Sequence, residues 1–231
     1  MRFLVTAGNT REKIDAVRDW GNIFTGNTGL SIARAICEIA PVDLFTSNRA
    51  HLQNLPPQIA GLAFISHAEL RGALAALLAR QKYDAIFMTA AVADYRPAGV
   101  YSVLERKITS GRETWVVQDV SAGKVKSTHK QIAVLGEPTE KIVDLFRGEW
   151  KYTGLLVKFK LEVGIDKDTL LKIGQASRIA SGANYLVANT LEMVEGPSSG
   201  AFLIGENGHE WVPRDDLPRR MADLIRANCP A

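Results

Sequence analysis

The sequence TAGNTREKIDAVRDWGNIFTGNTG, residues 6–29, decides how the rest of the chain is interpreted. It follows the apolar run Phe3-Leu4-Val5 and precedes an amphipathic run at 30–40, and it holds four glycines but little aliphatic bulk. This pattern predicts a strand, then a polar loop, then a helix. In an open α/β sheet such a loop lies at the carboxyl edge, where phosphates and other small ligands bind.

The same alternation continues along the chain. Apolar residues at helical spacing across 30–40 lead to a β-type run at 42–46, and such a βαβ unit implies parallel strands. The run DAIFMTAAV at 84–92 is apolar on both faces, which favours a central strand. Further strands are predicted at 62–65, 155–161 and 185–188, and further helices at 68–81, 138–148, 166–183 and 215–228. We therefore predict an α/β fold with a doubly wound, mostly parallel, Rossmann-like sheet.

Residues 98–137 interrupt this alternation. Two charged, alternating runs at 101–108 and 114–120 flank Thr109-Ser110-Gly111, which predicts an antiparallel hairpin, and a short strand is predicted at 131–135. We interpret this segment as a β flap within a single domain that spans 1–231. A second hairpin is predicted near the end of the chain, around Glu206-Asn207-Gly208.

Composition limits the classes of function. The net charge of the 231-residue chain is only +3, and no run of five or more Lys and Arg suggests a nucleic-acid surface. The two cysteines do not form a disulfide framework, no segment is apolar enough to span a membrane, and the N-terminus has no signal peptide. These features predict a cytoplasmic protein without nucleic-acid or membrane partners, and the mild positive charge is compatible with an anionic small substrate, as it is for many proteins.

The glycine-rich loop itself allows two interpretations. Gly21, Gly26, Asn27 and Thr28 come close to a phosphate-binding P-loop, but Asn27 stands where that motif requires Lys, so we reject the P-loop. The dinucleotide fingerprint GxGxxG is also missing after the first strand. Residues 25–29 still open a helix, whose free N–H groups can form an anion site, and a plain glycine-rich helix cap is the alternative.

Other polar residues have weaker signals. Asp94 follows the central strand, so it is either a turn residue or a ligand contact at the sheet edge. Lys107, Lys124 and Lys126 lie in the flap, as solvated charges or as a cationic loop that closes over phosphates. The four histidines are scattered, and their spacing does not indicate a metal site.

Several motifs together are more specific than any one of them. They are Val5-Thr6-Ala7-Gly8, Thr10-Arg11-Glu12, Ile14-Asp15 with Val17-Arg18, Asn22 with Gly26 and Gly29, the run at 90–97 (AAVADYRP), Lys107-Ile108, Pro138 with Lys141-Ile142, Phe159-Lys160-Leu161-Glu162 and Val187-Ala188-Asn189. In this order they resemble the phosphopantothenoylcysteine synthetase family, the second enzymatic half of the bifunctional coenzyme A biosynthesis flavoprotein. The resemblance covers most of the chain.

The resemblance implies a ligase. A nucleoside triphosphate, ATP or CTP with Mg²⁺, would activate the carboxylate of 4′-phosphopantothenate, and cysteine would attack the resulting acyl-nucleotidylate to form the amide. Because the flavin-binding decarboxylase half is missing from this sequence, the resemblance implies a stand-alone synthetase without flavin. Members of the family are homodimers in which the flap takes part, so we expect a homodimer here.

The resemblance also implies roles for individual residues. Asn22 would hold the acyl intermediate with Arg18 nearby, and a flap lysine would stabilise the phosphates. Lys107 is preferred for that lysine because of its spacing from Asp94, and Lys124 is the alternative. The nucleotide-binding residues would be Ala91, Asp94, Lys107, Pro138, Thr139, Glu140, Lys141 and Phe159. The substrate-binding residues would be Asn22, Gly26, Asn27, Thr28 and Asn189.

Four positions depart from the family's pattern. Asn9 replaces a usual second Gly, and Asn27 stands where a Lys or Arg is common. Ser177 and Ser181 stand where CTP-specific bacterial members carry lysines. These departures leave the choice of ATP or CTP open and motivate a second hypothesis, a paralogue that binds a nucleotide or phosphorylated ligand without catalysis. A nicotinamide-dependent reductase, the third hypothesis, lacks both the glycine fingerprint and a Tyr-xxx-Lys pair.

Overall fold

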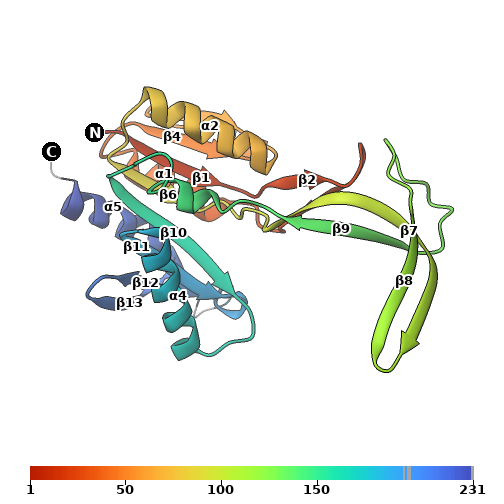
Figure 1. Cartoon of the computed structure of the whole chain (residues 1–231). Helices are drawn as coiled ribbons and strands as arrows, with labels where there is room; N and C mark the ends of the chain where they lie inside the picture. Colours follow the sequence, from red (N-terminus) through yellow and green to blue (C-terminus); the bar gives the residue numbers. More distant parts are fainter. Residues whose placement is uncertain (195, 197–198, 230–231) are drawn as a thin grey trace.

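One eight-stranded sheet organises the protein, with the strand order β13-β12-β11-β10-β6-β1-β4-β5 (Figure 1). The computed structural model describes residues 1–194, 196 and 199–229. Six strands are parallel: β1 (Phe3–Ala7), β4 (Val42–Thr46), β5 (Ile59–Ala63), β6 (Ala85–Met88), β10 (Leu155–Glu162) and β11 (Tyr185–Thr190). The antiparallel hairpin of β12 (Gly200–Gly205) and β13 (Gly208–Pro213) extends one edge. The predicted mostly parallel sheet is confirmed.

Helices cover both faces of this sheet. Side chains of alternate residues in a strand point to opposite faces. Accordingly, Phe3 and Val5 belong to one core with α1 (Asn27–Ile36) and α5 (Leu217–Asn228). Leu4 instead belongs to a second core with α2 (His67–Arg80) and α3 (Ile142–Leu145). The helix α4 (Lys167–Ser181) packs on the β11 and β12 end of that second face. The doubly wound arrangement is therefore confirmed.

The sheet reverses its strand order between β1 and β6. The chain runs outward from β1 to β4 and β5, and then returns to place β6 on the other side of β1. At this topological switch point the chain after β1 leads to α1 on one face of the sheet, and the chain after β6 leads through residues 95–138 to α3 on the other face. Such a point is the usual position of a ligand crevice in an open α/β sheet. Backbone hydrogen bonds join the carboxyl ends of β1 and β6, from Ala91 N to Gly8 O (2.8 Å) and from Thr10 N to Ala91 O (3.1 Å).

The predicted flap is a separate three-stranded antiparallel ribbon. It consists of β7 (Tyr95–Thr109), β8 (Arg112–Asp119) and β9 (Ile132–Pro138), with β7 in the middle. Figure 1 shows the β7–β8 hairpin projecting away from the main sheet. The hairpin turns at Ser110-Gly111, as the sequence predicts. It carries exposed apolar side chains at Leu104, Ile108, Trp115, Val116 and Val117.

Two predictions of secondary structure are wrong. The loop expected at residues 6–29 contains a small hairpin, β2 (Arg11–Lys13) and β3 (Asp19–Gly21), in which the Trp20 ring lies against Gly136 of β9. The helix expected from Pro138 begins only at Ile142. Pro138 instead ends β9, an edge strand, where a residue without an N–H is tolerated.

Several boundaries also differ from the predicted ones. β5 begins at Ile59, three residues earlier than predicted, and β6 ends at Met88 because Ala91 turns to bond with Gly8. Short 3₁₀ helices occur at Arg49–Leu52, Leu191–Met193 and Arg214–Asp216. Among the described residues, no helix has the length and apolar character needed to cross a membrane.

Candidate active site

A pocket of about 250 Å³ lies at the switch point, on the face covered by α1 and α5. Its walls come from the carboxyl ends of four parallel strands and from the start of α1. The sequence-predicted site residues that line it are Gly26, Asn27, Thr28, Ala91, Phe159 and Asn189. These six residues span most of the chain, so the fold brings together residues that the sequence separates.

Glycines allow α1 to begin directly on the sheet edge. Gly26 has a positive φ of 82°, and a Cβ at this position would lie 2.0 Å from the backbone nitrogen of Gly8. A Cβ at Gly29 would lie 2.4 Å from Thr89 Oγ1 and 2.7 Å from Ala7 Cβ. Any side chain at either position would push α1 away from β1 and β6. The glycines noted in the sequence therefore determine the shape of this end of the pocket.

The start of α1 offers uncapped hydrogen-bond donors to the pocket. Gly26 is its N-cap residue, and no described side chain bonds to the first-turn N–H groups. Such groups have no carbonyl partner within the helix, and the helix dipole adds partial positive charge there. A phosphate or carboxylate is the ligand group that suits this end of the pocket.

Two cations lie in the pocket wall, and neither was predicted as a site residue. Lys160 comes from β10 and forms an ion pair with Glu162 at 2.8 Å, and Arg214 follows β13 and donates to the carbonyl of Val194. None of the described lining residues is an Asp or Glu. The pocket therefore favours an anionic ligand. Lys160 occurs in a motif quoted above, whereas no local sequence signal marks Arg214.

Asn22, the amide expected to hold the acyl group, is not a lining residue of the pocket but contacts one. Its Nδ2 donates to the carbonyl oxygen of Ala91 at 3.2 Å, and its own carbonyl accepts from the Asn9 side chain. Asn9 also bonds to Ser47, through its backbone N–H at 2.8 Å and its Oδ1 at 3.2 Å. Asn9, which departs from the family's pattern, thus joins the loop that holds Asn22 to the end of β4.

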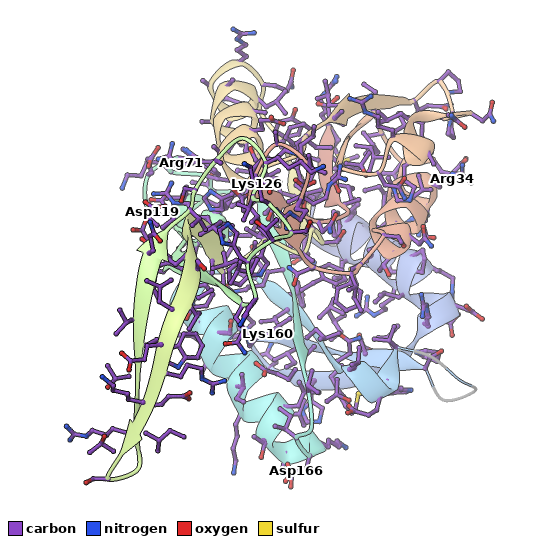
Figure 2. The ribbon with its side chains drawn as sticks, turned by 90° about the vertical axis from the view of Figure 1, so that its right-hand side faces the viewer. Arg34, Arg71, Asp119, Lys126, Lys160 and Asp166 are labelled. Atoms are coloured by element: carbon purple, nitrogen blue, oxygen red, sulfur yellow. The ribbon has the colours of Figure 1, made fainter. Side chains whose placement is uncertain are left out.

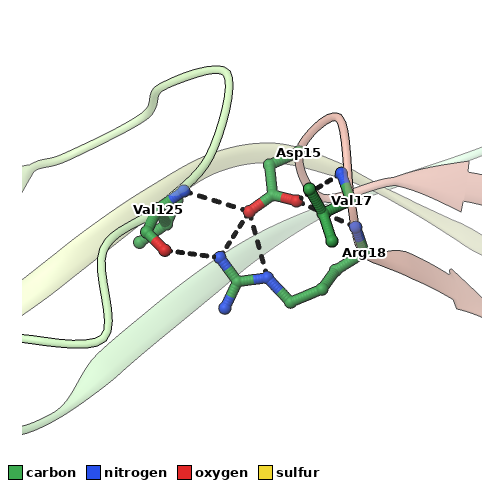
Figure 3. Close-up of polar contacts among 4 residues, drawn as sticks. All are labelled: Asp15, Val17, Arg18 and Val125. Atoms are coloured by element: carbon green, nitrogen blue, oxygen red, sulfur yellow. Dashed lines mark hydrogen bonds and ion pairs between the residues drawn. The ribbon is translucent and has the colours of Figure 1, made fainter.

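Arg18 does not line the pocket, and its side chain instead contacts Asp15 and Val125. Its guanidinium forms an ion pair with Asp15 and donates to the carbonyl of Val125 at 2.9 Å (Figure 3). The Asp15 carboxylate also accepts from the backbone N–H groups of Val17, Arg18 and Val125. The Arg18 guanidinium and these N–H groups hold the pKa of Asp15 well below its usual range. This latch fixes the segment after β8 onto the loop that leads to Asn22.

The predicted nucleotide-binding residues separate into two groups. Ala91 and Phe159 line the pocket, whereas Asp94 lies beside Thr139, whose N–H donates to the Asp94 carbonyl at 2.9 Å. Pro138 pairs with Tyr95 in the ribbon. Glu140 forms an ion pair with Arg71 of α2 at 2.7 Å, and Lys141 is the N-cap residue of α3.

The two candidate flap lysines occupy different places. Lys107 is exposed on the projecting β7–β8 hairpin and forms an ion pair with Glu105 at 3.1 Å, so the structure does not bring it to the pocket of its own chain. Lys124 precedes Val125, the residue that the Asp15 latch binds. Lys126, which follows Val125, is labelled in Figure 2 on the loop after β8. The role of Lys107 stays a prediction.

A buried lysine that sequence reasoning missed lies next to one of the departures. Lys158 of β10 is 9% exposed, and its Nζ donates to Ser177 Oγ at 3.0 Å and to the Ser177 carbonyl at 3.3 Å. Burial lowers the pKa of Lys158. The Ser181 hydroxyl donates to the Ser177 carbonyl at 3.0 Å. Lys158 thus contacts one of the two serines at which the family's pattern has lysines, but it does not line the pocket.

Comparisons with known proteins show the family of this chain. Residues 1–118 match the family described as DNA/pantothenate metabolism flavoprotein C-terminal domain. The chain is 27% identical over 237 residues to the coenzyme A biosynthesis bifunctional protein CoaBC of Thermococcus kodakarensis, and 30% identical over 234 residues to that of Mycobacterium bovis. Each alignment covers 97% of this chain and 50% of the relative. The chain thus spans about half the length of these curated relatives.

Solved structures give the same result. A DNA/pantothenate metabolism flavoprotein from Streptococcus pneumoniae superposes with a TM-score of 0.83 at 26% identity, covering 98% of this chain and 99% of that chain. A Cab2 variant in complex with phosphopantothenate-cysteine superposes with a TM-score of 0.71 at 16% identity, covering 98% and 85%, which shows a shared fold. The chain therefore belongs to the DNA/pantothenate metabolism flavoprotein C-terminal domain family, the phosphopantothenoylcysteine synthetase half of the CoaBC proteins.

Proposed function

We propose that this chain is a phosphopantothenate–cysteine ligase, built as one domain over residues 1–231 with a flap at about 98–137. The observation that carries the proposal is the switch-point pocket, in which the uncapped start of α1, Lys160 and Arg214 favour an anion. Asn22 donates to the carbonyl of Ala91 in its wall. Both 4′-phosphopantothenate and a nucleoside triphosphate are anions. The Cab2 relative, whose structure contains phosphopantothenate-cysteine, supports this choice of substrate.

The proposed reaction has two steps. The carboxylate of 4′-phosphopantothenate attacks the α-phosphate of ATP or CTP, and pyrophosphate leaves. The amine of cysteine then attacks the acyl carbonyl, and the nucleoside monophosphate leaves with the bonding electrons. Asn22, with its amide fixed against Ala91, would hold the acyl group, and the α1 terminus with Thr28 would hold an anionic group of the substrate. Asn189 and Phe159 would form the opposite wall.

Mg²⁺ would enter with the nucleotide. Within the described residues, no group of three or more His, Cys, Asp and Glu could hold a metal ion. Mg²⁺ commonly binds through substrate phosphates and only one or two carboxylates, and Asp94 is the predicted nucleotide contact that could supply one. When bound, the ion would neutralise phosphate charge during activation.

For the flap lysine, the contacts of a single chain favour Lys124 over Lys107. The Asp15 latch binds both the N–H and, through Arg18, the carbonyl of Val125, and Ala16 N donates to Gly123 O at 2.9 Å. The backbone on both sides of Lys124 is therefore held against the loop between β2 and β3, which continues to Asn22. Lys107 would have to act on the pocket of a partner subunit, because its hairpin projects away from its own sheet (Figure 1).

We also propose a homodimer that pairs through the ribbon. The exposed apolar side chains at Leu104, Ile108, Trp115 and Val116 would be covered by a second copy of the chain. Sedimentation of wild type and of Ile108→Glu tests this, because a charge in that contact would convert a dimer into monomers. A wild-type monomer at all concentrations would contradict the proposal.

The ligase proposal is tested by pyrophosphate release. Purified protein is mixed with Mg²⁺, 4′-phosphopantothenate, cysteine and either ATP or CTP, and pyrophosphate and the coupled product are measured together. We expect release that requires 4′-phosphopantothenate, with one nucleotide preferred. If neither nucleotide gives release or product, the chain is not this ligase.

Asn22→Asp tests the role of the Asn22 amide. The carboxylate would lose the two N–H donors, so we expect the amide-forming step to slow by about 100-fold, as for the loss of one donor to a developing oxyanion. Activation and the first release of pyrophosphate should persist. An unchanged rate of product formation would remove Asn22 from the mechanism.

The alternative function is a paralogue that binds a nucleotide or phosphorylated ligand without catalysis. Asn27, Ser177 and Ser181, which replace expected cations, favour it. Thermal stabilisation by a nucleotide in a protein that never releases pyrophosphate would select this alternative over the ligase.

A further inference from the structure

A buried histidine lies behind the wall of the pocket. His51, in the 3₁₀ turn after β4, is 5% exposed and contacts three polar side chains. Its Nδ1 lies 3.2 Å from Thr46 Oγ1, and its Nε2 lies 3.0 Å from Asn27 Oδ1 and 3.1 Å from Asn48 Nδ2. Asn27 is the first residue of α1 and lines the pocket, so His51 connects the end of β4 to the ligand site.

The contact with Thr46 favours one tautomer of His51, whereas the approach of Asn48 Nδ2 to Nε2 suits the other. Thr46 is fully buried, and its Oγ1 already accepts from the backbone N–H of Asn48 at 3.1 Å. The Thr46 hydroxyl hydrogen therefore needs an acceptor, and His51 Nδ1 is the partner within reach. With Nδ1 accepting, the neutral ring carries its hydrogen on Nε2 and donates it to Asn27 Oδ1. Burial, and to a lesser extent the charge of Arg34, lower the pKa of His51, which favours the neutral ring.

The side-chain amide of Asn48 is held by two other hydrogen bonds. Its Oδ1 accepts from the backbone N–H of Ala50 at 3.1 Å, and its Nδ2 donates to the Thr25 carbonyl at 3.2 Å. The amide of Asn48 therefore keeps its nitrogen toward His51. With Nε2 protonated, the 3.1 Å approach of Asn48 Nδ2 is a contact between two donors and not a hydrogen bond, so Asn27 Oδ1 is the acceptor for the Nε2 hydrogen. Asn48 also joins His51 to the residue just before α1.

Once its oxygen is held, the Asn27 amide has one orientation. No described residue accepts from Asn27 Nδ2, and Asn27 is part of the pocket wall. Its two N–H groups are then directed away from His51, beside the uncapped first turn of α1. An amide turned the other way would direct a carbonyl oxygen at the anion, which would repel it.

We infer that His51 is a positioning residue, which fixes the amide of Asn27 so that an uncharged pair of N–H donors meets an anionic group, a phosphate or carboxylate, of the bound ligand. The identity of the ligand rests on the proposed function, whereas the geometry of His51 and Asn27 does not. It explains how the pocket recognises an anion at a position that lacks the expected cation.

The first test needs no ligand. Long-range ¹H–¹⁵N spectra of the wild-type protein report which ring nitrogen of His51 carries hydrogen, with His51→Gln used to assign the signal. We expect a neutral ring protonated at Nε2 at neutral pH. A ring protonated at Nδ1, or at both nitrogens, would overturn the inference whether or not the protein is a ligase.

The second test uses two polar replacements of similar size. The side-chain amide of His51→Gln can place an N–H donor near the position of Nε2, whereas that of His51→Asn reaches only the position of Nδ1. We expect His51→Asn to weaken ligand binding about tenfold, as expected for one lost hydrogen bond to a charged group, and His51→Gln to stay close to wild type. His209→Gln, on the exposed hairpin strand β13, is the control.

Coupling to Asn27 separates positioning from a general loss of structure. Affinities for 4′-phosphopantothenate, ATP and CTP are measured separately by calorimetry, which shows whether the anion belongs to the substrate or to the nucleotide. We expect Asn27→Ala to match His51→Asn for the same ligand, and the double variant to bind no more weakly than either single variant. Equal losses in both His51 variants, or additive losses in the double variant, would overturn the inference. If wild type binds none of the three ligands, the proposed function fails, and the tautomer still decides the inference.

Discussion

The switch-point pocket and the projecting ribbon were both predicted to contribute catalytic residues, and they differ in how their side chains are held. In the pocket, Gly26 and Gly29 bring α1 against the sheet, and Asn27 bonds to a buried histidine. On the ribbon, Lys107 is exposed, and only the neighbouring Glu105 pairs with it among the described residues. The pocket residues are held in place by packing and hydrogen bonds, whereas the proposed role of Lys107 requires a partner subunit or a movement of the ribbon.

The segment after β8, residues 120–131, belongs neither to the pocket wall nor to the projecting hairpin. It lies between two ribbon strands, β8 and β9, in sequence, yet Val125 is buried and bound by Asp15 and Arg18 from the loop between β2 and β3. A residue's place along the chain is therefore a poor guide to whether it can reach the site. Four substitutions test this difference between the pocket and the ribbon.

The largest effect is expected from Gly26→Ala. The new Cβ would overlap the backbone of Gly8, so α1 must move and ligand binding should be lost, with a clear fall in melting temperature. Gly111→Ala is the matched control on the ribbon, because Gly111 also has a positive φ, of 76°, but nothing lies within 4 Å of its Cβ position. The control should lower the free energy of unfolding by only about 1–2 kcal/mol and leave binding unchanged. Equal effects would mean that the pocket does not depend on close packing.

The next effect distinguishes the two lysines. Lys124→Ala should lower the rate of pyrophosphate release by about 100-fold, as expected when one electrostatic contact to the reacting phosphates is lost. Lys107→Ala should leave that rate near the wild-type value. The reverse result would place the ribbon in the active site, and a mixed dimer of Lys107→Ala with Asn22→Asp would then show whether it acts across subunits.

Arg214→Ala should have a smaller effect. Its loss removes one of the two cations in the pocket wall, so the affinity for 4′-phosphopantothenate or nucleotide should fall about tenfold. The loss should shrink at high salt, because ions screen exposed charges. Arg219→Ala, whose side chain pairs with Asp216 outside the pocket lining, is the control and should not change the affinity.

The smallest effect is expected from the latch. Because the pKa of Asp15 is lowered in the folded protein, its charged form stabilises the fold above its ordinary pKa of about 4, and this stabilisation is lost as the pH falls through the folded-state value. Between about pH 8 and about pH 5, hydrogen exchange in residues 121–131 should follow only the intrinsic pH dependence of the chemistry. Asp15→Asn should speed exchange in this segment and leave the main sheet unchanged. Faster exchange across β1 and β6 would show that Asp15 has a wider structural role.

The sequence predicts most of the main sheet because its signals are local. β4 has the predicted bounds, and α4 begins after the predicted N-cap Asp166, whose side chain accepts from Thr169 N at 2.7 Å. The hairpin of β2 and β3 was missed because its strands are short and polar and are held by distant partners, such as Ile65 O and Gly136. Pro138 was placed in a helix because its strand neighbour, Tyr95, is more than 40 residues away.

The candidate site was predicted in part for the same reason. Gly26, Asn27 and Thr28 are adjacent in sequence and open a helix, so their role at a sheet edge could be inferred locally. Arg214 enters the pocket only through the fold, as the chain passes from β13 to α5. The bond between Asn27 and His51 depends on the positions of α1 and β4 relative to each other, which no local pattern specifies.

The most direct test of the account is to map where the substrate binds. Backbone amide shifts are followed by NMR while 4′-phosphopantothenate is added to the wild-type protein. The account predicts changes centred on residues 26–29, 90–91 and 189, at the carboxyl edge of the sheet, with no change at the tip of the β7–β8 hairpin. Changes confined to the ribbon, or no changes at saturating substrate, would contradict the claim that the switch-point pocket is the active site.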